Sequence, residues 1–158
     1  MTLSPRLNSF DRKITEWLID HSFDMMRWGL AIVFFWFGIL KFFPSLSPAE
    51  GIATKTISAL TFGLIPNGWI LPGLATLEVT IALGLLWRPA LRMTLLLLLL
   101  QMAGTLTPLI LFPAETFTRF PIAPTLEGQY IIKNLVLIAG ALVVGSTVRG
   151  NLRLSTEN

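Results

Sequence analysis

Glu78 is the residue of this sequence whose position points most directly to chemistry. It stands in the apolar segment LEVTIALGLL, about nine residues, or ~13 Å at helical rise, from the outer end of a predicted membrane span. A carboxylate in hydrocarbon costs on the order of 2.5 to 3.5 kcal/mol, so it needs a partner, a wet cavity or a nearby surface. We therefore expect Glu78 to be a candidate catalytic residue that accepts or relays a proton, or else a protonated or paired acid that holds two helices together.

Two lysines also stand in apolar surroundings. Lys41, in FGILKFF, is near the outer end of the predicted first span, and Lys133, in QYIIKN, is near the start of the predicted fourth, where Tyr130 and Asn134 concentrate polar groups at one depth. Either ammonium group can extend toward phosphate head groups and leave only its methylene stem in hydrocarbon. If instead both lysines face Glu78, the cluster has a surplus charge of +1 and favours an anion or a quinone oxygen.

Uncharged polar residues indicate that the third span contributes to the same polar cluster around Glu78. Gln101, near the middle of that span, has no surface within reach and needs a hydrogen-bond partner inside the bundle. Thr105 follows it one turn later, and Pro108 lacks the amide hydrogen that would bond the carbonyl of Gly104. The sequence therefore predicts a pocket in the outer half of the bundle, with Glu78 accompanied by these ligand-binding residues: Lys41, Gln101, Thr105, Tyr130, Lys133 and Asn134.

The composition predicts that these residues lie in a membrane. Of the 158 residues, 53% are hydrophobic and 13% are charged, where a soluble domain has roughly 25% charged residues. One span of a ~30 Å hydrocarbon layer needs about 20 apolar residues, so four spans fit comfortably. With no cysteine and one histidine, the chain offers no sulfur ligand to zinc or an iron–sulfur cluster and no pair of axial imidazoles to haem. We expect no metal site and no intrinsic cofactor.

The apolar segments predict four spans, over residues 25–43, 69–86, 91–111 and 130–148. The fourth span begins near Thr125 or near Tyr130. Residues 1–24 lack the apolar core of a secretory signal. An amphipathic helix along the membrane surface is predicted there instead by residues at steps of three and four: Leu7, Phe10, Ile14, Trp17, Leu18 and His21. A similar pattern over residues 52–64 predicts a short helix in the first outer loop. The expected fold class is an all-α bundle of four transmembrane helices, within a domain over residues 25–148.

The basic residues predict the orientation, because Lys and Arg near the ends of spans are retained on the cytoplasmic side. They gather in the amino-terminal segment, in the turn after the second span and in the tail at residues 149–158: Arg6, Arg12, Lys13, Arg27, Arg88, Arg92, Arg149 and Arg153. The other two connections hold only Lys55 and Arg119. We therefore expect both termini, including the tail, in the cytoplasm.

Three segments together resemble the DoxX-like superfamily of four-helix membrane proteins, and in particular its YkgB or RclC-type branch: FFWFGILKFFP, LEVTIALGLL and GQYIIKNLVLIAGALVV. The resemblance covers roughly residues 26–149 and depends on Gly38 and Lys41, on Glu78 and on Lys133, in that order. It implies a bacterial inner-membrane protein. Some members are similar to the small membrane subunit of thiosulfate:quinone oxidoreductase, and others are associated with resistance to oxidative or reactive-halogen stress. The resemblance assigns no catalytic residue.

Three functional hypotheses follow. In the first, the pocket binds a quinone or a small anion within a membrane redox or oxidative-stress system, Glu78 relays a proton, and any enzyme activity resides in a complex with a redox partner protein. The second is a proton-coupled transporter of a small solute, which with only four helices requires a homodimer. The third is a non-catalytic scaffold or assembly factor. The lipid bilayer is the common partner of all three, and we expect no nucleic-acid partner.

Overall fold

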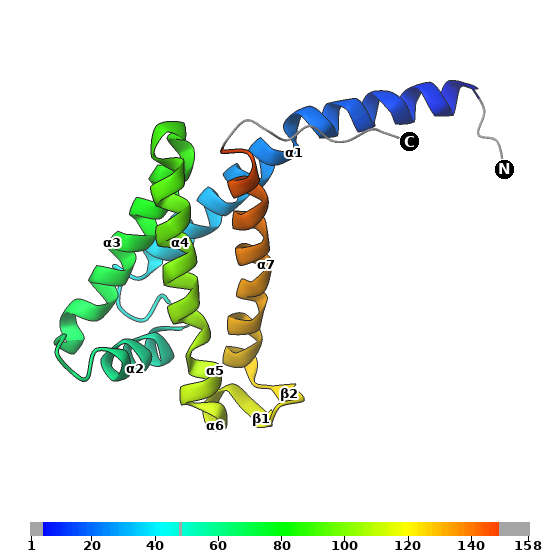
Figure 1. Cartoon of the computed structure of the whole chain (residues 1–158). Coiled ribbons are helices and arrows are strands. Elements are labelled where there is room, and N and C mark those ends of the chain that lie inside the picture. The colour runs from blue at the N-terminus through cyan, green and yellow to red at the C-terminus, as the bar shows by residue number, and fades with distance from the viewer. Residues whose placement is uncertain (1–4, 48, 149–158) are drawn as a thin grey trace.

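The computed structural model describes residues 5–47 and 49–148, so the predicted tail at 149–158 lies outside the described residues. Four long helices form a bundle (Figure 1): α1 (Pro5–Leu40), α3 (Asn67–Leu86), α4 (Leu91–Leu106) and α7 (Leu126–Ser146). In the described part of the chain, four helical segments are long and apolar enough to cross a membrane: Phe10–Leu40, Asn67–Leu86, Arg88–Leu111 and Leu126–Ser146. The prediction of an all-α, four-helix membrane protein is confirmed.

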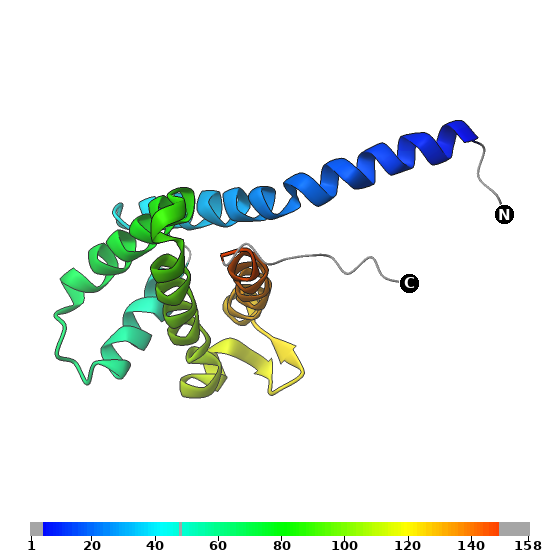
Figure 2. The same cartoon turned by 45° about the horizontal axis from the view of Figure 1, so that its top comes forward.

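Helix α1 is longer than the predicted first span. From Pro5 onward, the predicted surface segment and the first span form one continuous helix of 36 residues, which at 1.5 Å per residue is about 54 Å long. The helix ends at Leu40 rather than at residue 43, and residues 41–43 form a turn. Its first half projects beyond the other helices, whereas its second half packs mainly on α3 (Figures 1 and 2). The projecting half leaves Phe10, Ile14, Trp17 and Leu18 exposed, and its interfacial position stays a prediction.

The core lies where the four long helices meet. Helix α1 contacts α3 and α7, and α4 contacts the same two helices, so the bundle is closed into a ring. Each helix contributes buried apolar side chains to this core: Leu30, Phe34, Ile81, Leu85, Leu95, Leu98, Ala141 and Val144. Large apolar side chains also cover the outer surface, including Trp36, Leu100 and Val136. An exposed apolar surface of this kind is typical of contact with lipid.

Short elements connect the long helices. As predicted, a helix lies in the loop between the first two spans, α2 (Glu50–Leu60), and a tight turn follows α3, η1 (Arg88–Ala90). The loop before α7 holds α5 (Pro108–Leu111), α6 (Pro113–Thr116) and an antiparallel pair of strands that the sequence did not predict, β1 (Phe117–Arg119) and β2 (Ala123–Pro124).

Two local hydrogen-bond arrangements set the end of α4 and the start of α7. Helix α4 ends before Pro108, and the carbonyl of Gly104 accepts instead from the amide of Thr107, at 3.1 Å, and from its hydroxyl, at 2.6 Å. Helix α7 begins at Leu126, next to the earlier of the two expected starts, because Thr125 Oγ1 accepts from the amide of Gly128 at 3.1 Å and caps the helix.

Candidate functional site

Three of the predicted site residues meet inside the bundle. Lys41, just after the end of α1, places its Nζ 2.6 Å from Glu78 Oε2 on α3. Gln101 on α4 donates from Nε2 to Glu78 Oε1 at 3.0 Å. Lys41 Nζ also donates to the carbonyl of Phe37 at 3.2 Å. Glu78 is 7% exposed, so an ion pair withdrawn from solvent joins the end of α1 to α3, and the hydrogen bond from Gln101 adds α4. We call Lys41, Glu78 and Gln101 the polar cluster.

Gly38 allows the approach that brings these residues together. A Cβ at Gly38 would lie 2.9 Å from Glu78 Cβ and 3.2 Å from the backbone nitrogen of Val79. Both distances are shorter than ordinary van der Waals contact, so α1 and α3 touch through backbone at this point. Lys41 follows Gly38 by about one helical turn, and its side chain therefore reaches the carboxylate beside the contact.

Gly38→Ala is expected to lower the stability of the protein by about 1–3 kcal/mol, because the added methyl group pushes α1 away from α3. The measurement is the Tm of the purified protein in detergent. Gly29→Ala is the matched control, since a Cβ at Gly29 on the same helix meets no heavy atom of the described chain within 4 Å. An unchanged Tm for Gly38→Ala would show that the two helices do not pack through this glycine.

One acceptor of the polar cluster has no partner. The carboxylate of Glu78 requires a donor, so the amide of Gln101 turns its NH₂ group toward Oε1. Gln101 Oε1 is left buried without a hydrogen bond among the described residues, which costs about 1–3 kcal/mol for a desolvated polar group. An ammonium has three donors, and Lys41 directs two of them to Glu78 and Phe37. The cluster therefore has one unpartnered acceptor and one remaining donor.

The predicted residues of the fourth span do not belong to the polar cluster. Lys133 is exposed on α7, and its Nζ lies 5.5 Å from the centre of the Tyr130 ring. In the described part of the chain, the side chains of Lys133, Tyr130 and Asn134 form no hydrogen bond or salt bridge with the cluster. The expected surplus charge of +1 is thus absent there, because an exposed Lys133 keeps its ammonium outside the bundle and leaves a neutral pair of Lys41 and Glu78.

Thr105 is near the cluster in sequence but bonds its own helix. Its Oγ1 donates to the carbonyl of Gln101 at 3.0 Å. A hydroxyl satisfied in this way has its donor occupied, and only its lone pairs remain for a ligand. Thr105 therefore differs from Gln101, whose side chain bonds another helix.

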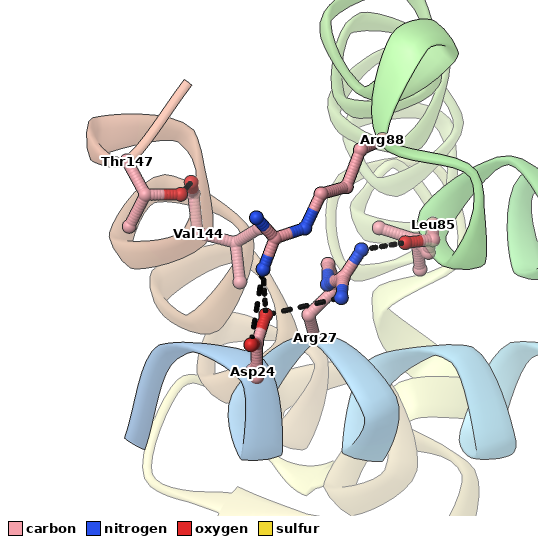
Figure 3. A network of polar contacts seen from close by, with 6 residues as sticks. All are labelled: Asp24, Arg27, Leu85, Arg88, Val144 and Thr147. Atoms are coloured by element: carbon pink, nitrogen blue, oxygen red, sulfur yellow. Dashed lines mark hydrogen bonds and ion pairs between the residues drawn. The ribbon is translucent and has the colours of Figure 1, made fainter. Parts of the chain in front are cut away.

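A second group of charged residues was missed as a site by the sequence analysis. Arg27 on α1 is only 8% exposed. It donates from Nη2 to Asp24 Oδ1 at 3.0 Å and from Nη1 to the carbonyl of Leu85 at 3.4 Å. Arg88, in η1, donates from Nη2 to both carboxylate oxygens of Asp24, at 3.0 and 3.1 Å, so the carboxylate lies between two guanidinium groups (Figure 3). We call Asp24, Arg27 and Arg88 the arginine cluster.

The sequence does carry a signal for Arg27. Leu30, Ala31 and Phe34, three, four and seven positions further on, are all buried in the core, and residues at this spacing share one face of a helix. Arg27 therefore belongs to the buried face of α1. The basic charge of Arg27 indicated only the orientation of the chain, whereas its spacing from these apolar residues indicates that it is buried.

Two hollows lie near α2 and the loop before α7, and neither is lined by the polar cluster. The larger, of 810 Å³, lies beside α2 and Phe112 and includes Lys55, which pairs with Glu115 and lies 4.6 Å from the centre of the Phe112 ring. The other, of 660 Å³, is almost entirely apolar: Leu109, Ile110, Pro113, Ala114, Phe117 and Phe120. Neither of these two hollows therefore reaches the polar cluster.

The fold and the two clusters define the class of protein: a four-helix membrane protein with an ion pair buried between its helices. Comparison with known proteins adds no relative, since no family model, curated protein or solved structure matches the chain. The function is therefore inferred from the clusters themselves.

Proposed function

We propose that the protein is a subunit of a membrane redox system and that its polar cluster binds the head group of a quinone. The observation that carries this proposal is Gln101 Oε1, a buried acceptor without a partner beside the neutral pair of Lys41 and Glu78. The resemblance to the DoxX-like superfamily supports a redox setting in a bacterial inner membrane, and the distribution of basic residues supports a cytoplasmic position for both termini.

The donors and acceptors of the cluster complement a quinone head group. The remaining N–H of Lys41 can donate to a carbonyl oxygen, and Gln101 Oε1 can accept from the hydroxyl of the reduced form. A quinone is uncharged and soluble in lipid, so it suits a neutral cluster reached from the bilayer better than a small anion does. Lys133, Tyr130, Asn134 and Thr105 take no part in this version of the site.

In this proposal Glu78 holds the proton. Its two carboxylate oxygens bond Lys41 and Gln101, the same two side chains that face the ligand in this proposal. A quinone, when bound, would supply two-electron and two-proton chemistry, with the electrons exchanged with a redox partner protein. The chain's own part is then to orient the head group through Lys41 and Gln101 and to take up or release a proton at Glu78.

A specific observation also favours the third hypothesis, a scaffold. The polar cluster joins α1, α3 and α4 without an opening toward the two hollows, as an ion pair that serves only to fix helix positions would. The described residues offer no observation that favours the proton-coupled transporter or its homodimer. Ligand content therefore separates the two remaining functions.

The protein purified in mild detergent is expected to retain a quinone, detected by lipid extraction and mass spectrometry. Gln101→Leu should lower the amount per protein several-fold to about tenfold, because it removes one hydrogen bond at the head group. Thr105→Val, one turn away on α4, is the matched control and should retain the wild-type amount. A wild-type protein with no more quinone than an unrelated membrane protein, or equal amounts in wild type and Gln101→Leu, would leave only the scaffold.

A further inference from the structure

The arginine cluster has more positive than negative charge. Two guanidinium groups, those of Arg27 and Arg88, share the single carboxylate of Asp24 (Figure 3). The other group that Arg27 bonds is the carbonyl of Leu85, which is polar but carries no net charge. Since Arg27 precedes Lys41 by about four helical turns, or ~21 Å, this cluster is separate from the proposed quinone site.

Two tryptophans indicate the depth of the arginine cluster in the membrane. Trp28 follows Arg27 and Trp87 precedes Arg88 in the chain, and the two are 52% and 65% exposed. Tryptophan is enriched where the hydrocarbon meets the head groups of the lipids. The two tryptophans therefore favour a position of the arginines at the level of the lipid phosphates.

Both arginines have donors to spare. Arg27 Nε is buried and forms no hydrogen bond among the described residues. Arg88 uses only Nη2 in its contacts with Asp24, and its side chain is 72% exposed. A guanidinium group presents a planar set of N–H donors that matches the oxygens of a phosphate two at a time. An exposed arginine beside a buried, incompletely bonded one is thus suited to this anion.

We propose that Arg27 and Arg88 form a binding site for a phosphate group at the membrane surface. Arg88 supplies the accessible N–H donors, Arg27 supplies the second positive charge, and Asp24 holds the two guanidinium groups together. A basic site between transmembrane helices at this depth is suited to the head group of an anionic lipid. Inorganic phosphate has the same recognised chemistry, so the experiment must distinguish the two sources.

The test is native mass spectrometry of the full chain in detergent with added phosphatidylglycerol, whose head group is anionic, or phosphatidylethanolamine, whose phosphate is neutralised by an amine. The wild-type protein should retain more phosphatidylglycerol. Arg88→Gln should lower this retention about fivefold, as expected for the loss of one arginine near the surface. Arg119→Gln, an exposed arginine of the loop before α7, is the control and should behave as wild type.

Competition identifies the source of the phosphate. If millimolar inorganic phosphate displaces the bound lipid, the site binds free phosphate as well, and if it does not, the ligand is the lipid. Equal retention of the two lipids, or equal retention of phosphatidylglycerol by wild type and Arg88→Gln, would overturn the proposal. Because Arg88 is exposed, its replacement should leave the fold and the quinone content unchanged, so this result is independent of the proposed function.

Discussion

Glu78→Ala is expected to lower the free energy of unfolding by about 3–5 kcal/mol, the loss that follows when one partner of a buried ion pair is removed. The side chain of Lys41 is only 10% exposed, so its ammonium would stay in a poorly solvated place without a counter-charge. Gln101 would lose the acceptor of its amide as well. The measurement is equilibrium unfolding of the purified protein in detergent, followed by circular dichroism.

An exposed salt bridge and a double variant show whether burial of the ion pair causes the loss of stability in Glu78→Ala. Lys55 and Glu115 also form a salt bridge, but their side chains are 50% and 45% exposed, so Glu115→Ala should cost less than about 1 kcal/mol. The double variant Lys41→Met with Glu78→Leu should regain most of the lost stability, because it leaves no unpaired charge. If Glu78→Ala costs no more than Glu115→Ala, the ion pair does not hold the helices together.

Gly128→Ala is expected to cost about 3 kcal/mol or more, at or above the upper end of what overpacking costs elsewhere. A Cβ at Gly128 would overlap the carbonyl oxygen of Thr116 and lie 3.0 Å from its carbonyl carbon. These are backbone atoms, and Thr116 is held by the bond from the amide of Thr125 to its carbonyl, at 2.9 Å. Neither the backbone at Gly128 nor the carbonyl of Thr116 can move without breaking the cap of α7. We therefore expect a large loss of Tm.

Gly73→Ala is the matched control for this substitution. Gly73 lies within α3, and a Cβ there meets no heavy atom of the described chain within 4 Å. The same chemical change should therefore leave Tm unchanged or raise it slightly, because alanine favours a helix. Similar values of Tm for the two variants would show that α7 does not begin against Thr116.

The sequence predicted the number and type of the long helices well, because a run of about 20 apolar residues has few alternatives to a membrane span. Their ends were harder to place. No proline interrupts the chain after Pro5 until Pro44, so the surface segment and the first span join in one helix. The start of α7 depends on a cap at Thr125, and the strands β1 and β2 are too short for a periodic pattern.

The candidate site was predicted in part, for a physical reason. A polar side chain deep in a span must find a partner, which brings Glu78, Gln101 and Lys41 together whatever the details of packing. Lys133 can instead extend its ammonium to the surface along its own methylene stem. The rotation of α7 about its axis decides whether Lys133 faces the polar cluster or the surface. Hydropathy does not determine that rotation. Arg27 shows the opposite outcome: the sequence analysis used it only to predict orientation, and its side chain is buried.

The ion pair between Lys41 and Glu78 has a consequence for biosynthesis. Its members belong to two consecutive spans that leave the ribosome before α4, so they can neutralise each other as soon as this hairpin has formed. Each charge on its own would oppose transfer from the translocon into lipid. We therefore expect the two spans to enter the bilayer together, while the remainder of the chain, with Gln101, is still being synthesised.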